Sequence, residues 1–157
     1  MRTDIADAYH HLVTQSVHHL ARSLLTAPST RPRPDQVAQL ISRICHALFE
    51  DPHAATDRLR RLIPHHPAPD LADRVRQEVQ DLNHRTTAAT ALTHFDFNLY
   101  PGTPLRPNRQ QPWGRCDPHQ PTHFVVAPAL LFEGRLYRPQ LVYTTATSTE
   151  PPTSTRP

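Results

Sequence analysis

The sequence contains no lysine, so all 17 of its basic residues are arginines. It also has only three glycines in 157 residues. That scarcity excludes the usual glycine-rich nucleotide-binding loops, whose backbone must approach a phosphate closely. The absence of lysine, beside abundant alanine, proline, threonine and histidine, is typical of a GC-rich genome and excludes no chemistry.

Long apolar runs are missing as well. No stretch approaches the roughly 18 consecutive apolar residues that a membrane-spanning helix needs. The N-terminal segment carries Asp4 and Asp7 and lacks the apolar centre of a secretory signal. The two cysteines, Cys45 and Cys116, lie far apart, and we interpret them as reduced thiols. We therefore expect a cytoplasmic protein that makes no membrane contact.

Catalytic signatures are equally scarce. The sequence has no nucleophile elbow and no H-E-x-x-H metalloprotease motif. The formal net charge of +3 is spread thinly, whereas nucleic-acid-binding domains usually concentrate positive charge on one face. We therefore lean away from an enzyme, and a small enzyme without a recognisable motif stays an alternative.

What the sequence does contain is a helical first half. Apolar residues recur there at spacings of three and four, which predicts amphipathic helices. Proline in the first turn marks two of the helix starts, with Asp35 after Pro34 in one and Asp51 as the cap before Pro52 in the other. The helices are predicted over residues 3–26, from Pro34 to Phe49, from Asp51-Pro52 to Pro64, and roughly over 71–91. Four such helices with short connections favour a bundle.

The composition changes near residue 93, and strand signals follow. Alternation over residues 95–100 predicts one strand, and residues 123–126 predict another. Residues 130–132 and 135–137 form a predicted β-hairpin across Glu133-Gly134. Because proline cannot donate to a strand ladder, Pro128 and Pro139 should end strands or confine them to edges.

We therefore predict a mainly α protein of the α+β class. The predicted four-helix body covers residues 1–93, and a Pro-rich segment with a C-terminal β-hairpin appendage packs on it over residues 94–143. Residues 144–157, rich in Ser, Thr and Pro, are predicted to be a disordered tail.

Residues 97–116, which we name the strap, are the candidate partner-binding segment. They contain arginines and aromatic residues but no acidic residue. Such side chains carry protein interfaces or stack on nucleic-acid bases. The candidate residues are Tyr100, Arg106, Arg109, Trp113 and Arg115.

Prolines in the strap recur every three residues, at Pro101, Pro104 and Pro107. This spacing matches the three-residue turn of polyproline II and predicts that their rings share one edge. The alternative is a rigid strap laid across the helices, with Trp113 as its anchor.

Histidines, of which the chain has twelve, raise the possibility of a metal site. Cys116, His119 and His123 form the best cluster, because thiolate and imidazole are zinc ligands; a fourth ligand would come from a residue such as His94 or Asp117. His11 and His18 lie two turns apart, about 10 Å at 1.5 Å per residue, too far to share one ion. We interpret that pair as part of a solvated helix face.

Together these observations predict a small cytoplasmic binding or assembly module that acts through protein–protein contacts, either with another protein or by self-association as a homo-oligomer. One alternative is a nucleic-acid-associated accessory protein that uses the arginines and aromatic residues of the strap. The other is a zinc-stabilised protein or a small enzyme. No cofactor apart from zinc is indicated.

Overall fold

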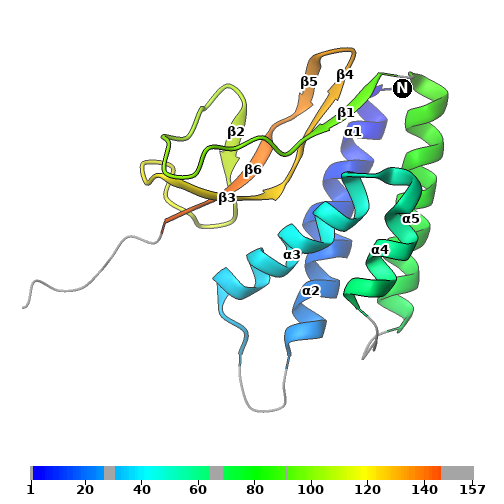
Figure 1. The fold of residues 1–157 in the computed structure, drawn as a ribbon, viewed down its shortest axis with the longest axis horizontal. Coiled ribbons are helices and arrows are strands. Elements are labelled where there is room, and N and C mark those ends of the chain that lie inside the picture. Colours follow the sequence, from blue (N-terminus) through cyan, green and yellow to red (C-terminus); the bar gives the residue numbers. More distant parts are fainter. Residues whose placement is uncertain (1, 27–30, 64–68, 91, 146–157) are drawn as a thin grey trace, which may run out of the picture.

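The computed structural model describes residues 2–26, 31–63, 69–90 and 92–145, which fold into a mixed structure of helices and strands. The helices lie on one side of the molecule and the strands on the other (Figure 1). The tail predicted over 144–157 falls almost wholly outside the described residues. Thr144, its first residue, instead ends a strand and is buried.

The described residues contain four helices, at the places where the apolar periodicity predicts them. The first is continuous and changes geometry in its middle, where it becomes π-helical. Its parts are α1 (Arg2–His11), η1 (Leu12–Val17) and α2 (His18–Leu25). The others are α3 (Pro34–Phe49), α4 (Ala55–Leu62) after a 3₁₀ turn η2 (Pro52–Ala54), and α5 (Pro69–Ala89).

The predicted starts of the second and third helices are confirmed. Pro34 occupies the first turn of α3, where a missing N–H costs nothing, and Asp35 beside it complements the helix dipole. The Asp51 carboxylate accepts a hydrogen bond from the backbone N–H of His53 at 3.1 Å. It thereby caps η2 with Pro52 in the first position.

Two small three-stranded sheets follow the helices. One has the order β1 (Thr93–Asp96), β4 (Ala129–Phe132), β5 (Arg135–Arg138), and the other β2 (Gln110–Pro112), β6 (Gln140–Thr144), β3 (Thr122–Ala127). Strands β4 and β5 pair antiparallel, as the predicted hairpin requires. Glu133 and Gly134 both have positive φ, at 52° and 78°, which a two-residue type I′ turn demands.

Proline marks the points where the chain leaves each strand. Pro128 separates β3 from β4, and Pro139 separates β5 from β6. Because each proline lacks the N–H that would continue a ladder, the chain passes from one sheet to the other at both places. The prediction that these residues end strands is confirmed.

The strand predicted over residues 95–100 is wrong in its extent, since β1 ends at Asp96. The Asp96 side chain accepts a hydrogen bond from the N–H of Asn98 at 2.8 Å, and this turn bends the chain out of the sheet. The Gln140 amide then donates to the carbonyls of Asp96 and Asn98, at 3.0 and 3.1 Å, in place of a neighbouring strand.

Strands β2 and β6 were not predicted. In β6 the buried residues are Gln140, Val142 and Thr144, so that two of the three inward positions are polar. The apolar residues Leu141 and Tyr143 are only half-buried. From its alternating polarity alone, the face of this strand that carries Leu141 and Tyr143 would be expected to lie in the core, but the opposite face is the buried one. The three residues of β2 pair parallel to β6 and carry no strand pattern of their own.

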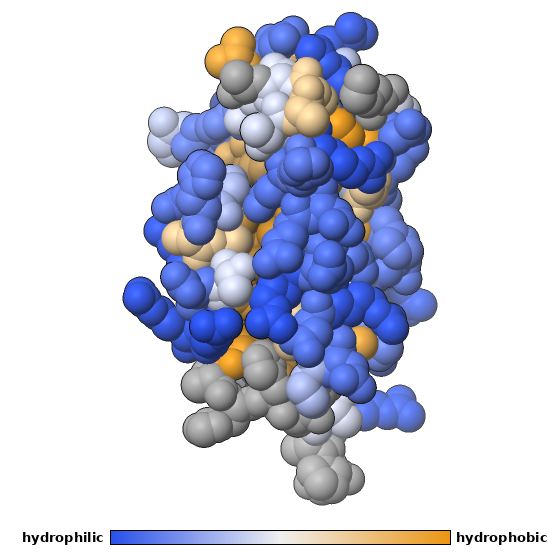
Figure 2. Space-filling view, turned by 90° about the vertical axis from the view of Figure 1, so that its right-hand side faces the viewer, coloured by the Kyte–Doolittle hydropathy of each residue, from blue (hydrophilic) through white to orange (hydrophobic). Residues whose placement is uncertain are grey.

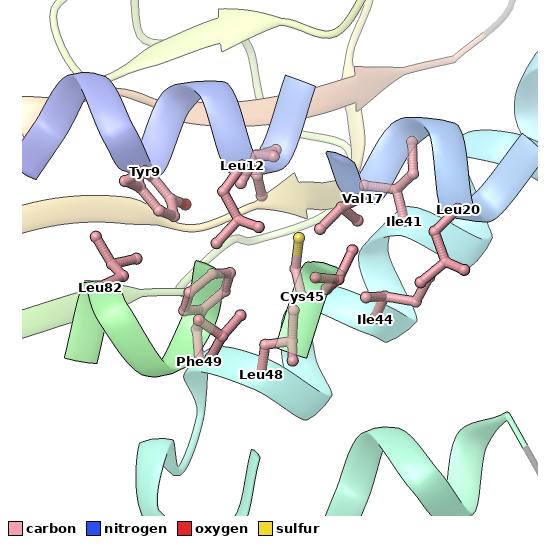
Figure 3. Packing of buried hydrophobic residues seen from close by; sticks show 14 of the residues in the cluster. Tyr9, Leu12, Val17, Leu20, Ile41, Ile44, Cys45, Leu48, Phe49 and Leu82 are labelled. Carbon is pink, nitrogen blue, oxygen red and sulfur yellow. The ribbon is translucent and has the colours of Figure 1, made fainter. Parts of the chain in front are cut away.

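One apolar core joins the helices to both sheets. Side chains of the first helix, α3 and α5 meet around Cys45 (Figure 3). Val126 and Ala127 from β3, with Leu130 and Phe132 from β4, belong to the same buried cluster. The strands are thus packed directly on the helical body.

Polar contacts fix the strands on the helices. The buried Tyr9 hydroxyl donates to the carbonyl of Pro128 at 2.6 Å, and burial raises the pKa of this phenol well above its usual value. The Ser42 hydroxyl of α3 donates to the carbonyl of Val125 at 2.5 Å. Arg138 of β5 forms an ion pair with Asp7 of α1. Buried carbonyls at the turn between the sheets therefore find donors on two different helices.

We predict that Tyr9→Phe lowers the free energy of unfolding by about 1–3 kcal/mol, because it leaves the buried carbonyl of Pro128 without a donor. Urea denaturation followed by circular dichroism measures this loss. Tyr100→Phe is the control, since the Tyr100 side chain is 77% exposed. Equal stability of the two variants would show that the Tyr9 hydroxyl does not hold the sheets.

Candidate functional site

The strap begins with a tight turn rather than with polyproline II. The N–H of Thr103 donates to the carbonyl of Tyr100 at 3.3 Å, and Gly102 between them has a φ of +87°. Polyproline II requires φ near −75°, which Gly102 does not have. The prediction of a continuous polyproline II edge through Pro101, Pro104 and Pro107 is therefore wrong.

The strap is held against the edge of β3 by backbone hydrogen bonds. The N–H of Gly102 donates to the carbonyl of Thr122 at 2.7 Å, and the N–H of Thr122 donates to the carbonyl of Thr103 at 2.9 Å. The buried Thr122 hydroxyl donates to that same carbonyl at 2.8 Å. These three bonds fix the first turn of the strap.

A relay of two buried amides fixes the middle of the strap. The Gln110 side chain accepts from the N–H of Arg106 at 2.9 Å and donates to the Gln140 carbonyl oxygen at 2.9 Å. Gln140 in turn donates to the backbone carbonyls at the end of β1. Both amides are more than nine-tenths buried. Sequence patterns did not identify either residue, because a glutamine is normally read as surface.

Trp113 holds the end of the strap on the helices. Its backbone N–H donates to the carbonyl of Val142 in β6 at 2.8 Å, and its half-buried indole packs against the apolar core. The ring also lies edge-on to the imidazole of His18, with 5.5 Å between the ring centroids. This placement supports the interpretation of Trp113 as an anchor. It also removes His18 from the solvated face on which we expected it, since the imidazole is only partly exposed.

The other candidate partner-binding residues point to solvent. Tyr100 is 77% exposed, and Arg106, Arg109 and Arg115 are all exposed. None of the three arginines forms an ion pair within the described part of the chain. The outer face of the strap is therefore positively charged, as its lack of acidic residues predicts.

A groove of about 570 Å³ lies on this outer face. Prolines make up half of its lining residues, at Pro104, Pro107, Pro112 and Pro118. Leu105 supplies a further apolar surface, and the remaining lining residues are Gln110, Gln111 and His119. The groove is thus mainly apolar, with positive charge beside it.

The structure does not bring Cys116, His119 and His123 together. Among the described residues, no group of three His, Cys, Asp or Glu side chains is placed to hold a metal ion. The Asp117 carboxylate accepts from the N–H of His119 at 2.8 Å, which turns the chain after Cys116. His123 lies on the exposed side of β3, beside the ring of Phe124. We therefore build no proposal on zinc.

Both cysteines are free. Cys45 is fully buried in the core, and this burial raises the pKa of its thiol far above the usual value. A thiol that stays protonated is a poor nucleophile and a poor metal ligand. Cys45 therefore acts as a small apolar residue, as its position on the helix predicts.

Comparison with known proteins shows no relative: no protein-family model, no curated protein sequence and no solved structure matches this chain. None of the helices in the described ranges combines the length and the apolar content needed to cross a bilayer.

We predict that Trp113→Ala lowers the free energy of unfolding by about 3 kcal/mol, the lower end of the cost of truncating a packed tryptophan, since the indole is half-buried. Thermal unfolding measures the loss. Tyr100→Ala serves as the comparison and should change stability little. If Trp113→Ala leaves the melting temperature unchanged, Trp113 is not the anchor of the strap.

We also predict that Gln140→Ala lowers the free energy of unfolding by about 2–3 kcal/mol. The substitution leaves the Gln110 amide and the carbonyl of Asp96 without their partner. Gln111→Ala, on the exposed side of β2, is the matched control and should cost less than about 0.5 kcal/mol. Similar losses in both variants would contradict a role for the amide relay.

Proposed function

We propose that this chain is a small cytoplasmic binding or assembly module that acts through protein–protein contacts. Its contact surface is the outer face of the strap. The observation that carries the proposal is the proline-lined groove, whose lining residues Leu105 and Pro107 flank the exposed Arg106 in the sequence. Tyrosine and arginine are enriched at protein interfaces, and the strap carries both as exposed residues.

The groove is suited to an extended peptide segment. Its proline rings have little conformational freedom, so that binding a ligand costs little conformational entropy in the groove wall. The amide relay and the bonds to Thr122 hold the backbone beneath it. The strap therefore offers a preformed surface rather than one that must order on binding.

The positive charge of the strap favours a partner segment that carries negative charge. Arg106, Arg109 and Arg115 are exposed and lack ion-pair partners within the described residues, and residues 97–116 contain no acidic side chain. Complementary charge speeds association and suppresses wrong partners. We therefore propose a partner segment with apolar side chains flanked by Asp or Glu.

The helical body supports this surface, and its apolar side chains are mostly turned inward. Its four helices share one apolar core, and on that basis we describe the body as a four-helix bundle within this proposal. The apolar stripe of the first helix is buried inside the chain. The face formed by α4 and α5 is mainly hydrophilic (Figure 2). Self-association, the second form of the proposal, would therefore also use the strap.

A second candidate function is the binding of single-stranded nucleic acid. The observation that favours it is that the strap carries the exposed Tyr100 and three exposed arginines without ion-pair partners among the described residues, since bases stack on aromatic rings and phosphates attract arginine. Binding driven by phosphates weakens steeply with salt, roughly 10³-fold or more between about 50 and 200 mM for six or more contacts, whereas an apolar protein interface does not.

We predict that a photoreactive amino acid at Leu105 forms a covalent adduct with one protein in the cells that produce this chain. Leu105 lines the groove, and the same amino acid at the exposed Gln77 of α5 is the positional control. Charge reversal by Arg106→Glu with Arg109→Glu should abolish the adduct, because it removes the attraction for the acidic segment.

Mass spectrometry of the adduct separates the candidates. A single protein captured at position 105 and not at position 77 supports the proposal, and a second copy of this chain supports its self-associating form. A nucleic-acid adduct that disappears with added salt supports the second candidate. Equal capture at both positions, or capture that survives charge reversal, would contradict both the protein-binding proposal and the nucleic-acid alternative.

A further inference from the structure

A second open site lies away from the strap. It is a cleft of about 650 Å³ between the first helix and α5, and it shares no lining residue with the groove. Its volume falls within the range of about 300–1,000 Å³ that small-molecule sites occupy. Partner binding at the strap does not involve this cleft.

The π-helical turn η1 shapes one wall of the cleft. In a π-helix each hydrogen bond spans five residues instead of four, which accommodates an extra residue in the turn. Leu12, Val13 and Val17 of η1 are buried in the core, while Thr14, Gln15 and Ser16 all line the cleft. Such turns recur at functional sites.

Ser16 joins this turn to the opposite wall. Its hydroxyl donates to the carboxylate of Glu78 on α5, with 2.8 and 3.0 Å to the two oxygens. The bond fixes the width of the cleft at η1. It also leaves Glu78 free to accept further hydrogen bonds, because a carboxylate has about four acceptor positions and Ser16 supplies one proton.

Positive groups predominate around this carboxylate. Arg22 projects from α2 and Arg74 from α5, so that a guanidinium group lies on each wall. Neither forms an ion pair with the described residues. His11, His18 and His19 also line the cleft. Burial, followed by the charge of Arg22, lowers the pKa of His18, and a bound anion would oppose that effect.

We propose that this cleft binds the phosphate ester of a small polyhydroxy compound, such as a sugar phosphate, with Arg22 and Arg74 holding the phosphate. Guanidinium groups match phosphate oxygens in a planar, two-pronged geometry. The hydroxyl and amide groups of Thr14, Gln15 and Ser23 and the Glu78 carboxylate then pair with the hydroxyls of the ligand.

The lining favours a hydroxyl-rich ligand over a nucleotide. Leu71 is the single aliphatic side chain among the described residues that line the cleft. A purine or pyrimidine stacks on apolar or aromatic surface, which here comes only from Leu71 and the three imidazole rings. The polar walls match a ligand that carries hydroxyl groups over its whole length.

The test is isothermal titration calorimetry with glucose 6-phosphate, ribose 5-phosphate and glycerol 3-phosphate, each compared with glucose and AMP. We expect one-to-one binding of at least one phosphate ester and none of glucose. The chain has a single tryptophan, Trp113, which contacts His18, so the same titration should change its fluorescence.

Arg22→Gln and Arg74→Gln should each weaken binding at least tenfold. Both residues are exposed, so the variants should keep the wild-type melting temperature. Arg85→Gln, farther along α5 and outside the cleft, is the matched control and should bind as the wild type does. Failure of all three esters to bind, tighter binding of AMP, or unchanged affinity in Arg22→Gln and Arg74→Gln would overturn the proposal.

Discussion

The passage of the chain from one sheet to the other at Pro128 is the constraint on which the rest of the structure depends. Pro128 is buried and has no N–H with which to extend a ladder, and β3 and β4 on either side of it belong to different sheets. Its carbonyl still needs a donor, because an unpaired buried carbonyl is costly. Tyr9 of the first helix supplies that donor, and Ser42 of α3 serves the neighbouring carbonyl of Val125. Two hydroxyl groups therefore fix where both sheets lie on the helices.

The strap keeps a fixed shape although little of it is strand, and proline explains part of this. Each proline removes one backbone donor that a packed loop would otherwise have to satisfy. Many of the donors and acceptors that remain are paired by backbone bonds, among them those to Thr122 and Val142, and others by the buried amides of Gln110 and Gln140. The apolar proline rings can then face solvent as the groove, because the polar backbone beneath them is already satisfied. This division supports the proposal of a preformed binding surface.

The sequence predicts what depends on local pattern and misses what depends on distant partners. Helix positions follow from the 3.6-residue periodicity, and the turn at Glu133-Gly134 follows from its flanking apolar runs. Strand β6 is not predicted because its buried positions include Gln140. The burial of this amide is explained only by the backbone carbonyls to which it donates, and these come from a distant part of the chain. The sequence predicts a solvated His18 because helical periodicity contains no information about the ring of Trp113, which lies 95 residues further along the chain and packs on this histidine. The cleft was missed for the same reason, since its walls come from the first helix and α5.

The contact between His18 and Trp113 also sets how strongly the cleft and the strap can influence each other. His18 lines the cleft and Trp113 anchors the strap, and their rings are in contact. An aromatic pair of this kind contributes about 0.5–1.5 kcal/mol. Coupling that passes through this pair cannot exceed that energy, which corresponds to at most about a tenfold change in affinity. Through this contact alone, a ligand in the cleft would adjust the partner binding that we propose for the strap rather than switch it on or off.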